Sequence, residues 1–263
     1  MKTLLPLNTI AALLIAIATP ALAETPEEKG LAIAKEAKAR DAGWSDMQAE
    51  MLMVLRNSQG EESIREIRMQ SLEVQGDGDK SLSIFDKPLD VKGTAFLSFS
   101  HAVGADDQWL YLPALKRVKR IASRNKSGPF MGSEFAYEDL ASFEVEKFTY
   151  KYLQDEGCGT EQCFVVEQYP VDQFSGYTRR VAWIDQSEYR IHKVMFYDRK
   201  DALLKTLTYQ DYKQYLDKHW RPNTMNMENH QTRKSTDLVW KGYQFKTGLT
   251  DADFNQNTLK RAR

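Results

Sequence analysis

Two cysteines are the side chains whose spacing most directly suggests chemistry. Cys158 and Cys163 flank the four residues from Gly159 to Gln162. Two thiols this close can form a local disulfide or supply two ligands to a metal ion. The export signal described below places them in an oxidising compartment, so we predict the disulfide and no metal site.

Signatures of catalysis are missing from the sequence. There is no Gly-x-Ser-x-Gly elbow, no phosphate-binding glycine loop and no dinucleotide fingerprint. The histidines are scattered without the spacing of metal ligands: His101, His192, His219 and His230. We therefore expect no enzyme and no cofactor.

Two polar groupings come closest to a site. A lipid-processing enzyme would need titratable groups gathered in a cavity, and the nearest candidates are Arg117, Glu134, Tyr137 and Asp139. Asp77, Asp79, Ser81 and Ser83 alternate like part of a calcium loop. The glycine there is misplaced and the closing Glu is absent, so we predict a polar hairpin turn.

A basic hairpin is predicted from Trp109 to Ile121, where Pro113 marks the turn and the second arm carries Arg117 and Arg120. It can be a solvated strand face beside a buried aromatic pair. Alternatively, one of these arginines stands at the mouth of an apolar cavity, where a guanidinium binds a phosphate or carboxylate head group.

The segment from Arg124 to Leu140 combines flexible points at Gly128, Pro129 and Gly132 with large apolar side chains. Those side chains are Phe130, Met131, Phe135 and Tyr137. Loops normally stay polar because they run over the surface. This segment is therefore either a flap that covers an apolar pocket or a plug that fills the end of a barrel.

The elements that must position these groups are mostly strands. A helix is predicted from Glu27 to Arg40, and a second short helix is predicted after an N-cap at Asp46, through Met51 and Leu55. From Ser63 the apolar pattern has period two, and a short helix follows Thr250. About eleven strands are expected: 63–74, 94–101, 108–112, 117–122, 148–153, 163–169, 177–185, 190–197, 202–212, 221–229 and 235–243.

So wide an antiparallel meander must curl or close, which predicts a barrel or half-barrel. Large side chains occur on both parities of several strands, as expected where helices cover one face and a ligand or lid covers the other. The candidate ligand-binding residues are Phe99, Trp109, Tyr111, Arg117, Arg120, Phe130, Met131, Phe135, Tyr137 and Trp183.

The N-terminus is typical of a signal peptide. Lys2 precedes an apolar run from Ile10 to Ala18, and cleavage is expected after Ala23. The run is shorter than the about 20 residues of a spanning helix. Residues 24–263 are then expected to form one periplasmic domain. Removing the signal peptide removes Lys2, so 35 of the chain's 36 basic side chains remain beside 37 acidic ones. A net charge of −2 gives no reason to propose a nucleic-acid partner.

The hairpin, the following segment and the C-terminal half resemble a known family. The residues that carry the likeness are 109–121, 128–140, Ile191 to Val194, Leu203 to Leu207, His219 to Pro222 and Leu249 to Phe254. Together they resemble the periplasmic outer-membrane lipoprotein-sorting proteins, relatives of the LolA and LolB carriers. The resemblance implies an unclosed antiparallel β-barrel wrapped around short helices, with a cavity that shields acyl chains.

It also implies an RND-type (MMPL-like) inner-membrane exporter as partner. This chain is larger than the dedicated lipoprotein carrier and has a longer flap, so free lipids and acyl conjugates are expected cargo beside lipoproteins. We expect a monomeric carrier that moves such cargo to the outer membrane and touches membranes transiently. The alternative is an accessory exporter subunit with no cargo of its own.

Overall fold

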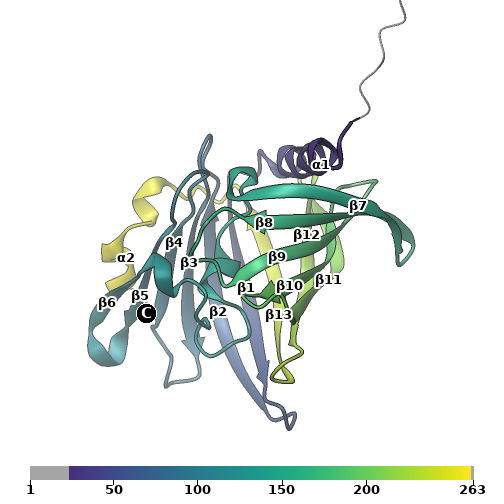
Figure 1. Cartoon of the computed structure of the whole chain (residues 1–263). Helices are drawn as coiled ribbons and strands as arrows, with labels where there is room; N and C mark the ends of the chain where they lie inside the picture. The colour runs from purple at the N-terminus through teal and green to yellow at the C-terminus, as the bar shows by residue number, and fades with distance from the viewer. Residues whose placement is uncertain (1–23, 262–263) are drawn as a thin grey trace, which may run out of the picture.

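The computed structural model describes residues 24–261, and the predicted signal peptide, residues 1–23, lies outside them. A single sheet of 13 strands runs in the order β6-β5-β4-β3-β2-β1-β13-β12-β11-β10-β9-β8-β7. Every neighbouring pair is antiparallel. The first and last strands of the chain, β1 and β13, pair with each other at the centre of the sheet (Figure 1).

The strands are β1 (Asp46–Arg56), β2 (Glu62–Leu72), β3 (Lys80–Lys87), β4 (Ala95–Phe99), β5 (Asp107–Leu112), β6 (Arg117–Ile121), β7 (Phe148–Cys158), β8 (Glu161–Pro170), β9 (Tyr177–Asp185), β10 (Ile191–Asp198), β11 (Leu203–Tyr215), β12 (His219–Asn229) and β13 (Lys234–Phe245). The α-helices are α1 (Pro26–Asp41) and α2 (Gln256–Arg261). Single 3-10 turns lie at Pro113–Leu115, Ser123–Asn125, Tyr137–Leu140, Val145–Lys147 and Asp251–Asp253.

The sheet curls but does not close, because its edge strands β6 and β7 do not pair with each other. Residues 122–147 connect these two edges, and we call this connection the seam loop. The predicted unclosed antiparallel barrel is confirmed. The predicted hairpin is confirmed too, as β5, the turn at Pro113–Leu115 and β6.

Helix α1 confirms the helix predicted from Glu27 to Arg40, and local capping fixes its start. Thr25 and Glu28 make a reciprocal capping box, and Pro26 occupies the first turn. The helix lies across one end of the curled sheet, beside β7 (Figure 1). A Cβ added at Gly30 would stand 2.9 Å from the backbone nitrogen of Tyr152, so this glycine permits the close contact between helix and strand.

Strands β1 and β3 lie where the sequence pattern predicted a helix and a polar turn. The predicted second helix after Asp46 is wrong: the segment is β1, in which Ala49, Met51 and Met53 are buried at every second position. Pairing with β2 and β13 on both sides overrides the local helical spacing. The predicted polar turn around Asp77 extends only to Asp79, and β3 follows it.

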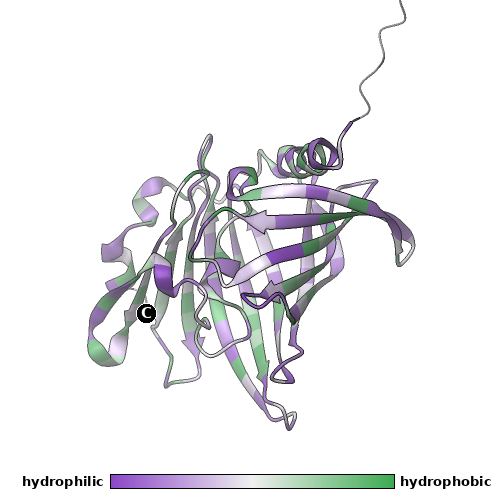
Figure 2. Ribbon diagram, in the orientation of Figure 1, coloured by the Kyte–Doolittle hydropathy of each residue, from purple (hydrophilic) through white to green (hydrophobic). Residues whose placement is uncertain are grey.

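Apolar residues are buried on both sides of the sheet, and Figure 2 shows hydrophobic and hydrophilic residues interspersed along the strands. The largest cluster fills part of the concave inner face. On the outer face, α2 covers an apolar patch of β3 to β5, where Leu259 is fully buried. No helix within residues 24–261 is long and apolar enough to cross a membrane.

Candidate functional site

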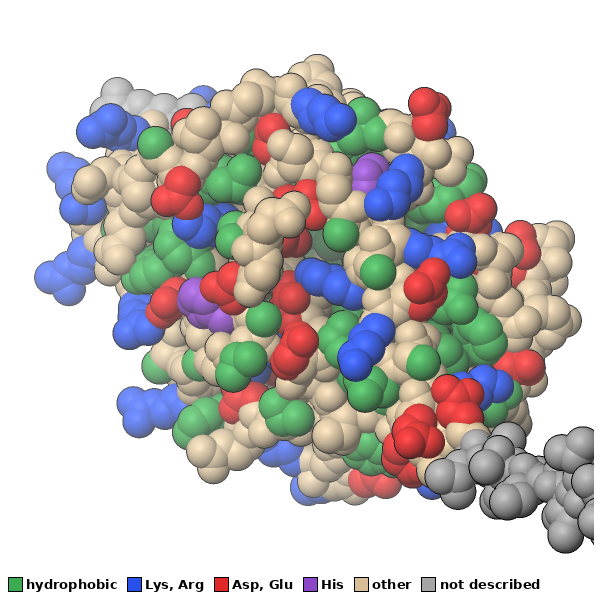
Figure 3. Space-filling view, turned by 90° about the horizontal axis from the view of Figure 1, so that it is seen from above, with side chains coloured by type: hydrophobic (Ala, Val, Ile, Leu, Met, Phe, Trp, Pro, Cys, Tyr) green, Lys and Arg blue, Asp and Glu red, His purple; other side chains and the backbone are tan. Residues whose placement is uncertain are grey.

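The inner face of the curled sheet bounds a hollow of about 1180 Å³. Helix α1, the seam loop, residues 100–106 and residues 170–175 form further parts of its wall. Its size exceeds the about 300–1,000 Å³ of common small-molecule pockets. Figure 3 looks down on the molecule from above, with charged side chains of both signs around the centre of this face.

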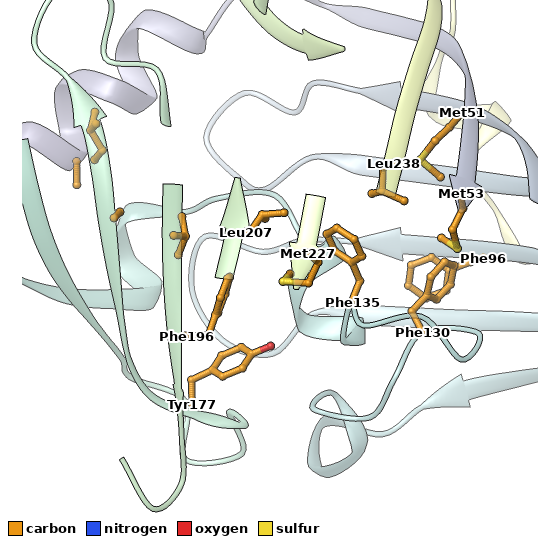
Figure 4. Close-up of a cluster of buried hydrophobic side chains, with 14 of the residues drawn as sticks. Met51, Met53, Phe96, Phe130, Phe135, Tyr177, Phe196, Leu207, Met227 and Leu238 are labelled. Carbon is orange, nitrogen blue, oxygen red and sulfur yellow. The ribbon is translucent and has the colours of Figure 1, made fainter. Parts of the chain in front are cut away.

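Aromatic and aliphatic side chains make up much of the hollow's wall. Strands β9 to β13 contribute Ile184, Val194, Phe196, Leu207, Met225, Leu238 and Trp240, and α1 contributes Ala34 and Ala37. Phe96 comes from β4 and Phe135 from the seam loop. Several of these residues face one another across the interior in Figure 4. The wall can therefore hold an apolar molecule without any covalent chemistry.

The seam loop lies inside the barrel because its aromatic side chains pack against the inner face. Phe130 and Phe135 are each 1 % exposed. The ring of Phe130 lies 5.1 Å from that of Phe96 and 5.7 Å from that of Tyr137, centroid to centroid. Figure 4 shows Phe130 and Phe135 beside methionines and Phe96 of the sheet. The loop thus fills one part of the interior and leaves the hollow in another.

Buried polar contacts tie the seam loop to the far strands. Lys205 Nζ of β11 lies 2.7 Å from a carboxylate oxygen of Asp139, and it also donates to the backbone oxygen of Glu134. Tyr177 of β9 donates its hydroxyl proton to Asp139, and Asn229 of β12 donates to the Glu134 carboxylate. Burial, then the Asp139 charge, raises the pKa of Tyr177 well above its usual range, so this phenol remains protonated.

Two carboxyl groups of the wall are perturbed by burial. Glu138 accepts hydrogen bonds from the Ser175 hydroxyl and the Gly176 backbone, while burial and the neighbouring Asp139 raise its pKa. Burial also raises the pKa of Asp79 to about 6, although the charge of Lys38 opposes this shift. Glu138 thus ties the seam loop to residues 175 and 176, whereas the Asp79 carboxylate accepts one hydrogen bond, from the Val74 backbone at 3.3 Å.

The predicted ligand-binding residues are divided between the two faces of the sheet. Phe130, Met131, Phe135 and Tyr137 belong to the inner cluster, and of these Phe135 lines the hollow. Phe99, Trp109 and Tyr111 pack on the outer face beneath α2. Trp183 packs on the outer face near the cysteines, with Lys193 Nζ 3.6 Å from its ring centre.

The two predicted arginines lie on the edge strand β6. Arg117 is exposed, and Arg120 is exposed and forms an ion pair with Asp107 of β5. Neither is among the residues that line the hollow. The lining residues of α1 and of β9 to β12 were not predicted as a group. Alternate residues of β9 face inward: Arg180, Ala182 and Ile184. This alternation identifies lining residues only when it is known which face of the sheet is the inner one.

Cys158 and Cys163 form the predicted disulfide across the β7–β8 turn, with 5.8 Å between their Cα atoms. The bridge lies on the outer face, in the cluster that contains Trp183. It therefore fastens the end of a hairpin and does not border the hollow.

The unclosed antiparallel barrel around this hollow is a LolA-like fold. The crystal structure of a LolA superfamily protein from Nitrosomonas europaea shares the fold with a TM-score of 0.69 at 21 % identity, over 87 % of this chain and 98 % of that one. A DUF1329 family protein from Desulfovibrio piger gives a TM-score of 0.84 at 27 % identity, over 89 % of this chain and 99 % of that one.

A domain from Vibrio parahaemolyticus described as an outer membrane lipoprotein-sorting protein is 64 % identical, with a TM-score of 0.88 over 89 % of this chain and all of that one. The chain therefore belongs to this family of lipoprotein-sorting protein domains. A family model described only as an uncharacterized protein also matches residues 77–261. No curated protein matches the chain.

Proposed function

We propose that this protein is a periplasmic carrier that holds a lipid, a lipoprotein acyl chain or another hydrophobic molecule in its hollow. The observation that carries the proposal is the hollow itself: about 1180 Å³ bounded by apolar side chains of the sheet, α1 and the seam loop. Membership of the lipoprotein-sorting family and the predicted signal peptide support the periplasmic location.

Binding would follow from the hydrophobic effect alone. Each methylene that leaves water for the wall of Val194, Leu207 and Leu238 contributes about 0.8 kcal/mol. A chain of about a dozen carbons would then offset the entropy lost on binding and leave a useful affinity. Release would need α1 or the seam loop to shift, since both cover the hollow. An RND-type inner-membrane exporter is our proposed donor or recipient of the cargo.

A matched pair of variants on α1 tests whether the hollow holds the cargo. Ala37 lines the hollow, whereas Ala39 on the same helix is exposed to solvent. Ala37→Trp puts an indole into the space that a chain would occupy, and Ala39→Trp adds the same group outside it. Native mass spectrometry of protein purified from the periplasm of its own cells should show bound lipid on the wild type and on Ala39→Trp, and at least severalfold less on Ala37→Trp.

Other results would count against the proposal. Lipid retained equally by both tryptophan variants would place the binding site elsewhere. Wild-type protein that arrives free of lipid would favour the accessory exporter subunit, which has no cargo of its own.

A further inference from the structure

A half-buried arginine lines the hollow on the inner face of the sheet. Arg180 of β9 lies in register with Gln168 of β8 on one side and Phe196 of β10 on the other. All three residues line the hollow. The exposed area that Arg180 retains is therefore directed at the space that a bound molecule would fill.

The guanidinium of Arg180 has hydrogen-bond partners on one edge only. Its Nε and Nη2 atoms both donate to Gln168 Oε1, at 3.1 and 2.6 Å. Its carbon lies 4.0 Å from the ring centre of Phe148, which packs against one face of the group. The Nη1 atom donates to no residue among those the structure describes. The Nη1–Nη2 edge is thus available for a bidentate contact.

No carboxylate within residues 24–261 forms an ion pair with Arg180 at 4.0 Å or less. Asp139 acts on it electrostatically from further away, but that carboxylate is already bound by Lys205 and Tyr177. The other groups that influence Arg180 are the phenols of Tyr150, Tyr177 and Tyr209. Burial raises the pKa of Tyr209 to about 12, so it is neutral at physiological pH.

A largely desolvated cation with no ion-pair partner within 4.0 Å among residues 24–261 is costly to a fold, and burial lowers the pKa of Arg180. Its neighbour on the same strand is different: Arg179 points to the outer face and pairs with Glu167 and Asp201. A carboxylate or phosphate brought by a ligand would supply what Arg180 lacks. Apolar side chains of the hollow, such as Phe196 and Leu207, would accept the rest of that ligand.

We propose that Arg180 binds the anionic head group of an amphiphile, a carboxylate or a phosphate, whose hydrocarbon tail occupies the hollow. This inference rests on the proposed carrier function and names the class of cargo. A guanidinium that meets the oxyanion with two parallel hydrogen bonds favours an anionic amphiphile over a neutral one of equal length.

Calorimetric titration of the wild-type protein with four probes tests this selectivity. Dodecanoate and dodecyl phosphate carry the anion, dodecanol carries the tail with a neutral head, and inorganic phosphate carries the anion alone. We expect dodecanoate or dodecyl phosphate to bind at least about tenfold more tightly than dodecanol, as a charge-assisted hydrogen bond allows. Inorganic phosphate should bind too weakly to detect, because it buries no apolar surface.

Two charge-matched variants assign the selectivity to one side chain. Arg180→Met removes the inward guanidinium and Arg179→Met removes the outward one. Arg180→Met should bind dodecanol with the wild-type Kd and lose the preference for the anionic probes, whereas Arg179→Met should keep it. Circular dichroism shows whether each variant is folded. If Arg180→Met is not, a wild-type protein that shows no preference for the anionic probes still overturns the proposal.

The outcomes separate the two proposals. Dodecanol binding without any preference for the anions would overturn the role of Arg180 and leave the carrier function intact. If no probe with a tail binds, the carrier function itself fails. Tight binding of inorganic phosphate would show an anion site that needs no tail, which also overturns the amphiphile proposal.

Discussion

Strands β3, β4 and β5 bury apolar residues on both faces, and the two faces are covered differently. On the outer face, Leu82 and Leu97 are sealed beneath Phe254 and Leu259 of the C-terminal segment. On the inner face, Phe96 meets Phe130 of the seam loop and also borders the hollow. An apolar face therefore becomes a binding surface only where its covering element leaves space.

The largest expected effect on stability comes from the seam loop, which covers part of the inner face. Phe130 is 1 % exposed and packs against Phe85, Phe96 and Tyr137. Phe130→Ala should lower the free energy of unfolding by about 3–5 kcal/mol, because it leaves a cavity among the rings of Phe85, Phe96 and Tyr137. Urea denaturation measures the change. Phe174→Ala, at a ring that is 40 % exposed, should cost less than about 1 kcal/mol.

If Phe130→Ala lowers the free energy of unfolding by less than about 1 kcal/mol, the interior is not tightly packed around this ring. The seam loop would then be better described as a mobile flap.

Helix α2, which covers the outer face, should contribute to the stability of the fold and not to the affinity for cargo. Leu259 of α2 is fully buried against the outer face of the sheet. Leu259→Ala should cost about 2–3 kcal/mol, at the lower end for such a change because a helix as short as α2 can settle into the space. Dodecanoate affinity measured by calorimetry should stay at the wild-type value. Lys260→Ala on the exposed side of α2 serves as control for both measurements. Weaker binding by Leu259→Ala would mean that the two faces are coupled.

Much of the fold follows from the sequence because its signals are local. The apolar spacing from Glu27 to Arg40 predicts α1, and the period-two pattern after Ser63 predicts the antiparallel meander. Segment 46–56 is different, since Met47, Met51 and Leu55 suit a helix and a strand equally well. Its strand conformation is set by β2 and by β13, which lies almost 200 residues further along the chain.

The site was harder to predict because parity does not reveal which face is inside. Trp183 and Ile184 are adjacent, large hydrophobic residues of β9, and they belong to opposite faces. An arginine at position 180 is typical of an exposed strand position when it is considered alone. Its functional interest appears only when the curl of the sheet turns it toward the hollow and leaves it without a carboxylate partner.

The smallest expected effect concerns a carboxyl group on the inner wall. Asp79 accepts a hydrogen bond from the Val74 backbone and lies near Glu73 and Glu144, and burial raises its pKa from 3.8 to about 6. The folded protein therefore binds this proton more tightly than the unfolded chain. The stability associated with the protonated group is present below pH 4 and decreases as the pH rises to about 6.

Asp79→Asn keeps a neutral side chain of the same shape at every pH. It should raise the free energy of unfolding by about 1–3 kcal/mol at pH 7.5, where wild-type Asp79 is ionised in a buried position. The gain should shrink toward zero at pH 4, where both side chains are neutral in the folded state. Asp90→Asn changes the same charge at an exposed position and should shift stability little at either pH. Urea titrations of the three proteins at the two pH values measure this, and an Asp79→Asn gain that does not depend on pH would show that the ionised carboxylate is not what destabilises the wall.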